Sequence, residues 1–165
     1  MYIFGIDPTK ARTEAEGAEF DIGQVGFNTT SDGSKGYIYV EDSGSGITGD
    51  GYVALINSSD FTAVMATTTT SAPGTGAGKM AGVARAAIAA SGFGWLQIFG
   101  PGTVRVSASA AAHTLINTTA TAGQLDDDAT AGAEVMDGIV LNTANGGSAA
   151  TAAGFLNWPK VGRTL

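Results

Sequence analysis

His113 is the only histidine of the chain, and it is the first residue whose chemistry could support catalysis. Histidine often acts as a general base near neutral pH because its ordinary pKa lies close to that range. A serine nucleophile would also need a sharp turn that exposes its hydroxyl group, and a second titratable partner. The segment SAAAHTLIN around His113 contains neither. We therefore predict a half-exposed histidine in a strand or turn, and no catalytic residue.

Four carboxylates are concentrated in the segment LDDDATAGAE, residues 125–134. Carboxylate oxygens are the ligands that hard cations such as Ca²⁺ prefer. Neighbouring side chains of an extended segment point in alternate directions, however, and the Asp/Asn pattern of a calcium loop with its following glycine is absent. The segment therefore predicts a solvated acidic turn and no metal site, with the carboxylates Asp126, Asp127, Asp128 and Glu134 facing water.

The segment APGTGAGKM, residues 72–80, has the glycines and the lysine of a phosphate-binding loop. Backbone amides of such a loop surround the phosphates, and a Ser or Thr after the lysine binds magnesium. Here Pro73 stands in place of the first glycine and Met80 in place of the Ser or Thr. A threonine run also stands where a buried strand should precede the loop. We predict a flexible polar loop over residues 66–79, with no nucleotide or other cofactor.

Trp95 and Trp158 are the largest side chains in a chain with few aromatic residues. Tryptophan can line a ligand groove, but each ring also buries roughly 150–250 Å² when it packs in a core. The first use would fit a carbohydrate-binding β-sandwich. We favour the second, and predict that Trp95, Phe99 and Trp158 anchor the core or a subunit interface.

The charge pattern argues against nucleic acid as the main partner. The 165 residues include 8 basic and 15 acidic side chains, which gives a net charge of -7. Phosphate binding needs a clustered basic face. The basic residues are instead scattered along the chain, and none occurs between Val106 and Pro159.

The chain has no cysteine, so neither a disulfide framework nor a thiolate metal site is possible. The N-terminus lacks the basic start and the long apolar core of a signal peptide. No apolar run approaches the roughly 18 residues that a membrane-spanning helix needs. We expect a protein made without a cleavable export signal and without a membrane partner.

Strands are the elements expected to position these residues. The 25 glycines and many threonines disfavour helix interiors and separate short apolar runs. Turn signals and alternating apolar residues predict a hairpin around Asp32-Gly33, a second hairpin over residues 92–106 that turns at Gly100-Pro101-Gly102, and strands over residues 52–56, over residues 135–141 and up to Trp158-Pro159. Residues 81–90 fit either a helix or a strand.

This pattern predicts an all-β fold, an antiparallel β-barrel or sandwich with at most one short helix, over a single domain of residues 20–165. Residues 1–19 differ from the rest, since an apolar tip precedes a charged stretch without periodicity. We predict an extended N-terminal arm that becomes ordered against a partner. Its contact residues would be Tyr2, Ile3, Phe4 and Ile6.

Several sequence segments of the chain resemble those of a known family. They are the strand GVA, the segment GWLQIFG at residues 94–100, the phrase NTTATAGQLDDD and the closing LNWPKVG. Together with the strands that begin at FDIGQVGF, they cover residues 20–162 and resemble the head decoration, or capsid cement, proteins of tailed bacteriophages.

The resemblance implies a structural virion protein without enzymatic activity. Such a protein binds the outer surface of the expanded capsid, commonly as a homotrimer at local threefold axes, and its partner is the major capsid protein. In that setting the arm would add a strand to a capsid subunit. Two other hypotheses remain open at this point: another virion component, such as a head-fibre base or a tail-associated β domain, and the carbohydrate-binding β-sandwich.

Overall fold

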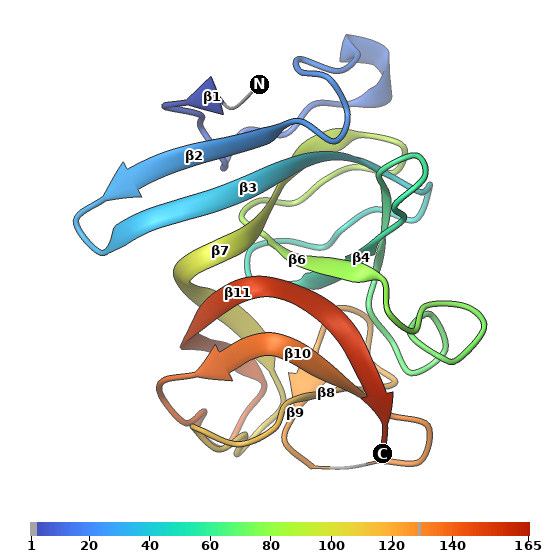
Figure 1. Cartoon of the computed structure of the whole chain (residues 1–165), viewed down its shortest axis with the longest axis vertical. Coiled ribbons are helices and arrows are strands. Elements are labelled where there is room, and N and C mark those ends of the chain that lie inside the picture. Colours follow the sequence, from blue (N-terminus) through green and yellow to red (C-terminus); the bar gives the residue numbers. More distant parts are fainter. Residues whose placement is uncertain (1–2, 129) are drawn as a thin grey trace.

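The structure, a computed structural model, describes residues 3–128 and 130–165, and its regular secondary structure consists almost entirely of β-strands (Figure 1). A short 3-10 helix, η1 (Glu14–Glu16), lies between the first two strands of the chain. The strands are β1 (Ile3–Phe4), β2 (Val25–Thr30), β3 (Gly33–Asp42), β4 (Val53–Ile56), β5 (Thr62–Met65), β6 (Met80–Ala84), β7 (Phe93–Val106), β8 (Asn117–Thr118), β9 (Leu125–Asp126), β10 (Glu134–Leu141) and β11 (Ala150–Thr164). The all-β prediction is confirmed.

Nine of the 11 strands form two closed circuits that share β7, while β2 pairs with β3 and β1 pairs with β2 outside the circuits. In the first circuit β7 pairs with β3, followed by β5, β4 and β6, which returns to β7. In the second, β7 pairs with β11, followed by β10, β8 and β9, which returns to β7. Most pairings are antiparallel as predicted, but β1–β2, β3–β5 and β7–β9 are parallel. The chain is thus a pair of small barrels side by side.

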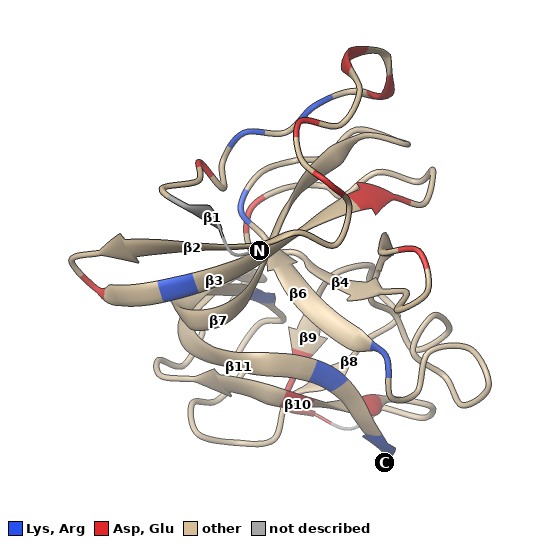
Figure 2. Ribbon diagram, turned by 45° about the horizontal axis from the view of Figure 1, so that its top comes forward, with Lys and Arg blue, Asp and Glu red and all other residues tan. Residues whose placement is uncertain are grey.

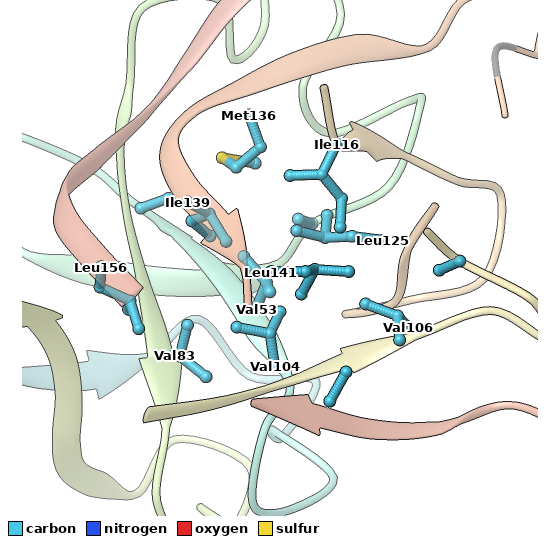
Figure 3. Packing of buried hydrophobic residues seen from close by; sticks show 14 of the residues in the cluster. Val53, Val83, Val104, Val106, Ile116, Leu125, Met136, Ile139, Leu141 and Leu156 are labelled. Carbon is cyan, nitrogen blue, oxygen red and sulfur yellow. The ribbon is translucent and has the colours of Figure 1, made fainter. Parts of the chain in front are cut away.

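Each barrel has its own apolar core. The core of the first contains Ile38, Val40, Ala54, Ile56, Leu96 and Ile98, with further small side chains. The core of the second is drawn in Figure 3, and its large side chains include Val104, Val106, Ile116, Leu125, Met136, Ile139, Leu141 and Leu156. They come from β7, β9, β10, β11 and the residue before β8. Val53 and Leu55 also belong to the second core, because β4 presents alternate residues to the two barrels.

A third cluster of buried side chains is mainly aromatic and covers the outer face of β3 and β7. Tyr39 and Trp95 have ring centroids 5.0 Å apart, and Phe20 packs against both rings. Tyr37 and Phe93 complete the layer. Both faces of β3 and of the first half of β7 are therefore buried, which explains why bulky residues are concentrated in this part of the sequence.

The prediction of a hairpin over residues 92–106 is wrong. These residues form one continuous strand, β7, which pairs with β3 as far as Phe99 and with β11 from Phe99 onward. Gly100 has a φ of 93°, and a Cβ there would lie 2.3 Å from the carbonyl oxygen of Ser34. The Gly-Pro-Gly sequence therefore marks the place where the strand passes from one barrel to the other.

Other local predictions can be compared with the elements directly. The hairpin of β2 and β3 forms as predicted, but its two turn residues are Ser31 and Asp32, because Gly33 already pairs with Thr30. The ambiguous segment at residues 81–90 starts as strand β6 and continues as a loop. The last strand, β11, continues past Pro159 to Thr164. No helix in the described ranges is long and apolar enough to cross a membrane.

The N-terminal segment differs from the predicted free arm, because much of it packs on the domain. Ile6 is only 5% exposed and belongs to the aromatic cluster. Arg12 and Phe93 exchange two backbone hydrogen bonds of 2.8 Å. Strand β1 adds to the edge of β2 in parallel. Of the proposed contact residues, Tyr2 lies outside the described part of the chain, and Ile3 and Phe4 form β1.

Candidate functional site

His113 lies in an exposed turn, where its backbone has a φ of 59° and its amide donates a hydrogen bond to the carbonyl oxygen of Leu141. Asp126 is the last residue of β9, and its half-buried side chain accepts a 2.9 Å hydrogen bond from the amide of Asp127. The prediction that all four carboxylates of residues 125–134 face water is wrong for Glu134, which is buried. In the described residues, no three His, Cys, Asp or Glu side chains are grouped so that they could hold a metal ion.

The backbone amides of the glycine-rich loop are already used within the protein. The amides of Thr75 and Gly76 donate to the carbonyl oxygen of Ala72, and the amide of Gly78 donates to that of Val161. A phosphate-binding loop keeps such amides free for its ligand. Ser71, at the start of the loop, is fully buried and lies 3.1 Å from the hydroxyl group of Thr118. This segment is therefore anchored between β6 and β8.

A cleft of about 380 Å³ opens beside the bend of β7. Gln97 is fully buried, and its Nε2 donates to the carbonyl oxygens of Phe99, Gly100 and Pro101 at 3.1, 3.3 and 2.9 Å. Arg85 donates to Gln97 Oε1 and to the backbone and hydroxyl oxygens of Thr103.

Asp50 completes this network by pairing with the Arg85 guanidinium. Gln97 thus donates to three backbone carbonyls at the bend of β7 and Arg85 donates to a fourth, while the other hydrogen bonds of Arg85 go to side chains. Tyr37 lines the same cleft; burial raises its pKa, and the positive charge of Arg85 opposes the shift. The network accounts for the bend of the shared strand without a ligand.

Two buried carboxylates serve local structure. Asp42 is 2% exposed, and its Oδ2 accepts hydrogen bonds from the amides of Gly44, Gly46 and Ser91, which ties two loops together. Glu134 is 1% exposed, and Thr164 donates a 2.8 Å hydrogen bond to its Oε1. Each carboxylate has a second oxygen for which the described residues provide no hydrogen-bond donor.

The outer surface of β10 and β11 carries large apolar side chains in contact with solvent. Val140, Phe155 and Trp158 are 45%, 39% and 47% exposed. Val140 and Phe155 are cross-strand partners, and Phe155 contacts the half-buried Phe99 of β7 edge to face, with ring centroids 5.6 Å apart. We call this surface the β10–β11 apolar face, defined by Phe99, Val140, Phe155 and Trp158.

Trp158 of this face has an unusual backbone, because its φ is 50°. The left-handed region costs an L-residue with a large side chain roughly 1–2 kcal/mol. A register shift in the β10–β11 pairing between Asp137 and Ile139 places Trp158 opposite Gly138. Strain at an exposed aromatic residue that adds little to the core suggests a role outside folding.

Charged residues flank the β10–β11 apolar face. Asp137 and Lys160 are exposed cross-strand partners, and Arg163 follows on β11, whose basic residues can be seen in Figure 2. The side chains of these three residues form no ion pair or hydrogen bond with the described part of the chain. Apolar area surrounded by unpaired charges is typical of a protein-binding surface.

Neither a protein-family model nor a curated protein sequence matches this chain. The assignment of a function therefore depends on the surfaces described above and on the resemblance noted in the sequence.

The predicted anchor residues lie in two different environments. Trp95 is 2% exposed and lies in the aromatic cluster, whereas Phe99 and Trp158 belong to the β10–β11 apolar face. Val140 and Phe155 were missed. The sequence does contain a signal for them, since Ile139-Val140-Leu141 and Phe155-Leu156 are consecutive apolar residues in strands. Successive strand residues point to opposite faces, so such runs indicate apolar side chains on both.

Proposed function

We propose that this chain is a structural protein that decorates the outer surface of a tailed-phage capsid and stabilises it without catalysing a reaction. The β10–β11 apolar face is the observation that carries the proposal, because solvent-exposed Val140, Phe155 and Trp158 would gain stability when covered by another protein. The resemblance of residues 20–162 to capsid cement proteins supports the choice of a tailed-phage capsid as the particle that this chain binds.

Binding of such a protein stabilises a shell by ordinary linkage. A protein that binds the assembled shell and not its separated subunits shifts the equilibrium toward assembly. We expect the chain to bind as a homotrimer. An oligomer makes several weak contacts with the shell at once, so it dissociates from the shell more slowly than a single copy would. Two small barrels with filled cores supply a rigid spacer for such contacts.

Co-assembly with the major capsid protein of the same genome tests the proposal. Purified chain should co-sediment with expanded shells and raise the temperature at which they open, and cryo-electron microscopy should place it on their outer surface. An all-β protein of similar size and charge serves as the control. Shells that bind no more of this chain than of the control, with the same opening temperature, contradict the proposal.

The other two hypotheses give different outcomes in related experiments. A head-fibre base or tail-associated domain would be recovered with fibres or tails and be absent from shells. A carbohydrate-binding protein would bind glycans in solution. Glycan binding would need an accessible indole ring. Trp95 is buried and neither tryptophan lines the cleft, so Trp158 on the open β10–β11 apolar face is the ring that a glycan could reach.

A further inference from the structure

We infer that the cleft beside the bend of β7 binds a carboxylate, held by the ammonium group of Lys35 and the hydroxyl group of Tyr37. The ligand is a monocarboxylate with a short apolar body, either a small acid or the acidic side chain of a bound protein. The inference goes beyond the proposed function and does not depend on it, because no residue of the β10–β11 apolar face lines the cleft.

The cleft has polar groups that are already used within the protein and others that are available. Arg85 and Gln97 direct their donors to the bend of β7 and to Asp50. Lys35 and Tyr37 stand two residues apart on β3, so their side chains lie on the same face of the strand, and both line the cleft. A ligand bound to these two side chains leaves the network that shapes β7 intact.

The hydroxyl group of Tyr37 is a hydrogen-bond donor without an acceptor. Tyr37 is 3% exposed, yet no described residue forms a hydrogen bond with its hydroxyl group, and the oxygen is not enclosed by protein. Since the residue lines the cleft, this oxygen faces the cleft. Burial raises the pKa of Tyr37, so the hydroxyl group stays protonated at neutral pH and can donate. A buried tyrosine normally has a partner for this group, and here the position is open to a ligand.

The ammonium group of Lys35 is the cation that the network leaves available. The Lys35 side chain is 18% exposed, and its ion pair within the described residues is with Asp32 Oδ2 at 3.8 Å, which is beyond hydrogen-bond distance. The Asp32 side chain is 69% exposed and lies in the turn between β2 and β3, so this pair is weak. A ligand carboxylate at about 3 Å from the ammonium nitrogen would form the stronger, hydrogen-bonded pair.

The charges around the cleft favour a ligand with one negative charge. Asp50 neutralises Arg85, which leaves Lys35 as the cation of the cleft lining that can compensate a ligand. A phosphate monoester carries up to two negative charges, and Asp32 would repel the second. A carboxylate carries one charge and has two acceptor oxygens, one for Lys35 and one for Tyr37.

The shape of the cleft suits a short apolar body beside the carboxylate. Its volume of about 380 Å³ lies within the range of small-molecule sites. Pro101 and Ala153 contribute apolar atoms to the lining, and Gly102 and Gly154 contribute backbone without side chains. Butyrate and the side chain of a glutamate residue both have this combination of groups.

Nuclear magnetic resonance titration of the isotope-labelled full chain tests the site. The probes are butyrate for a small acid and N-acetylglutamate N-methylamide for an acidic side chain, and the probe that binds more tightly identifies the source of the carboxylate. We expect saturable shifts of the amide signals of Lys35, Tyr37 and Gly102. Butyramide is the control, because it has the shape of butyrate without the charge and should not bind.

Variants of the two donors and of the competing carboxylate give opposite expectations. Lys35→Met should raise the dissociation constant of the tighter probe at least about 10-fold, and Tyr37→Phe about 5-fold. Asp32→Asn should lower it, because the protein's own carboxylate no longer competes for the ammonium group. Lys160→Met and Asp21→Asn are the matched controls, since both residues are exposed and neither lines the cleft. Circular dichroism and thermal melting verify that each variant is folded.

Each outcome supports or overturns the inference. Shifts that do not saturate with either probe overturn it, as does butyramide that binds as tightly as butyrate. A dissociation constant unchanged by Lys35→Met and Tyr37→Phe also overturns it, because the carboxylate then binds elsewhere. Weaker binding by Asp32→Asn contradicts competition by that side chain. A chain that binds the probe but not shells leaves the inference standing while the proposed function fails, and shell binding without probe binding gives the reverse result.

Discussion

Gly138 and Trp158 lie opposite each other where the pairing of β10 and β11 shifts register, and both have a positive φ, of 80° and 50°. A Cβ on Gly138 would lie 2.6 Å from the carbonyl oxygen of Asn157, so the β10 side of this irregularity requires glycine. On the β11 side a glycine would also be the most stable choice. The chain has tryptophan there instead.

Trp158→Gly should therefore leave the monomer at least as stable as wild type. Relief of the left-handed backbone gains roughly 1–2 kcal/mol, and the extra freedom of glycine in the unfolded chain offsets about half of that gain. Urea denaturation at a concentration where the wild type is monomeric measures the difference. A loss of stability greater than about 2 kcal/mol would mean that the indole ring belongs to the core.

Trp95→Ala should have the opposite effect on folding. Trp95 is 2% exposed and packs against Tyr39 and Phe20, so its removal leaves a cavity in the aromatic cluster. Substitutions of this kind cost about 3–5 kcal/mol. Chemical denaturation measures the free energy of unfolding of Trp95→Ala and of Trp158→Ala. Equal losses of stability in the two variants would contradict the assignment of Trp95 to the core and Trp158 to the surface.

Gln97→Leu should destabilise the chain by about 2–3 kcal/mol, because the carbonyl oxygens of Phe99, Gly100 and Pro101 lose their donor inside the protein. Gln97→Glu keeps an acceptor for Arg85 but also removes the donor, so we expect a similar loss. The free energy of unfolding of both variants is the measurement. If Gln97→Glu were as stable as wild type, the pairing with Arg85 would be the contact that matters.

Gly100→Ala should destabilise strongly, since Gly100 has a φ of 93° and its Cβ would lie 2.3 Å from a backbone oxygen that cannot move alone. The expected cost is at least about 2 kcal/mol. Gly146→Ala is the control, because nothing lies within 4 Å of the corresponding Cβ. The thermal melting midpoint of Gly100→Ala should lie clearly below that of Gly146→Ala. Equal midpoints would mean that β7 tolerates a side chain at the position where it passes between the barrels.

Stability should fall at high pH because of Tyr37. Burial raises its pKa above the ordinary 10.0, so the folded chain keeps the neutral phenol while the unfolded chain ionises. The stability that this group contributes is fully present below pH 10 and is lost as the pH rises through the raised pKa. Tyr37→Phe should lose less stability than wild type between about pH 9 and about pH 11 in urea denaturation. Identical slopes would contradict the role of Tyr37.

Local features of the fold could be predicted from the sequence, and features that depend on distant pairing could not. The β2–β3 hairpin was predictable because the turn signal Asp32-Gly33 and the alternating residues are contiguous, and the observed turn is only one residue earlier. Gly100-Pro101-Gly102 carries an equally strong turn signal, but β3 and β11 supply partners on the two sides of β7 and keep the strand extended. No local pattern reveals that such partners exist.

The candidate surface was predictable only in part, for a similar reason. Trp158 was recognised as an anchor, yet Trp95 lies where β7 pairs with β3 and Trp158 lies in β11, so only the pairing of distant strands separates the two rings. The polar network was missed because Arg85 directly follows β6 and Gln97 lies in β7, so the two meet only when β6 pairs with β7. The N-terminal segment was expected to be free, since nothing in its own residues shows that Ile6 completes the aromatic cluster.

The shared strand also imposes an order on synthesis. All strands of the first barrel have been synthesised once Phe99 has left the ribosome. The second half of β7 remains without its partner β11, which pairs with it over Ala150 to Asn157, until those residues are made. During that interval the half-strand that will border Val104 and Val106 has an unsatisfied edge. We expect the growing chain to be most prone to aggregation in this window, so that translation speed between the two barrels governs the yield of native protein.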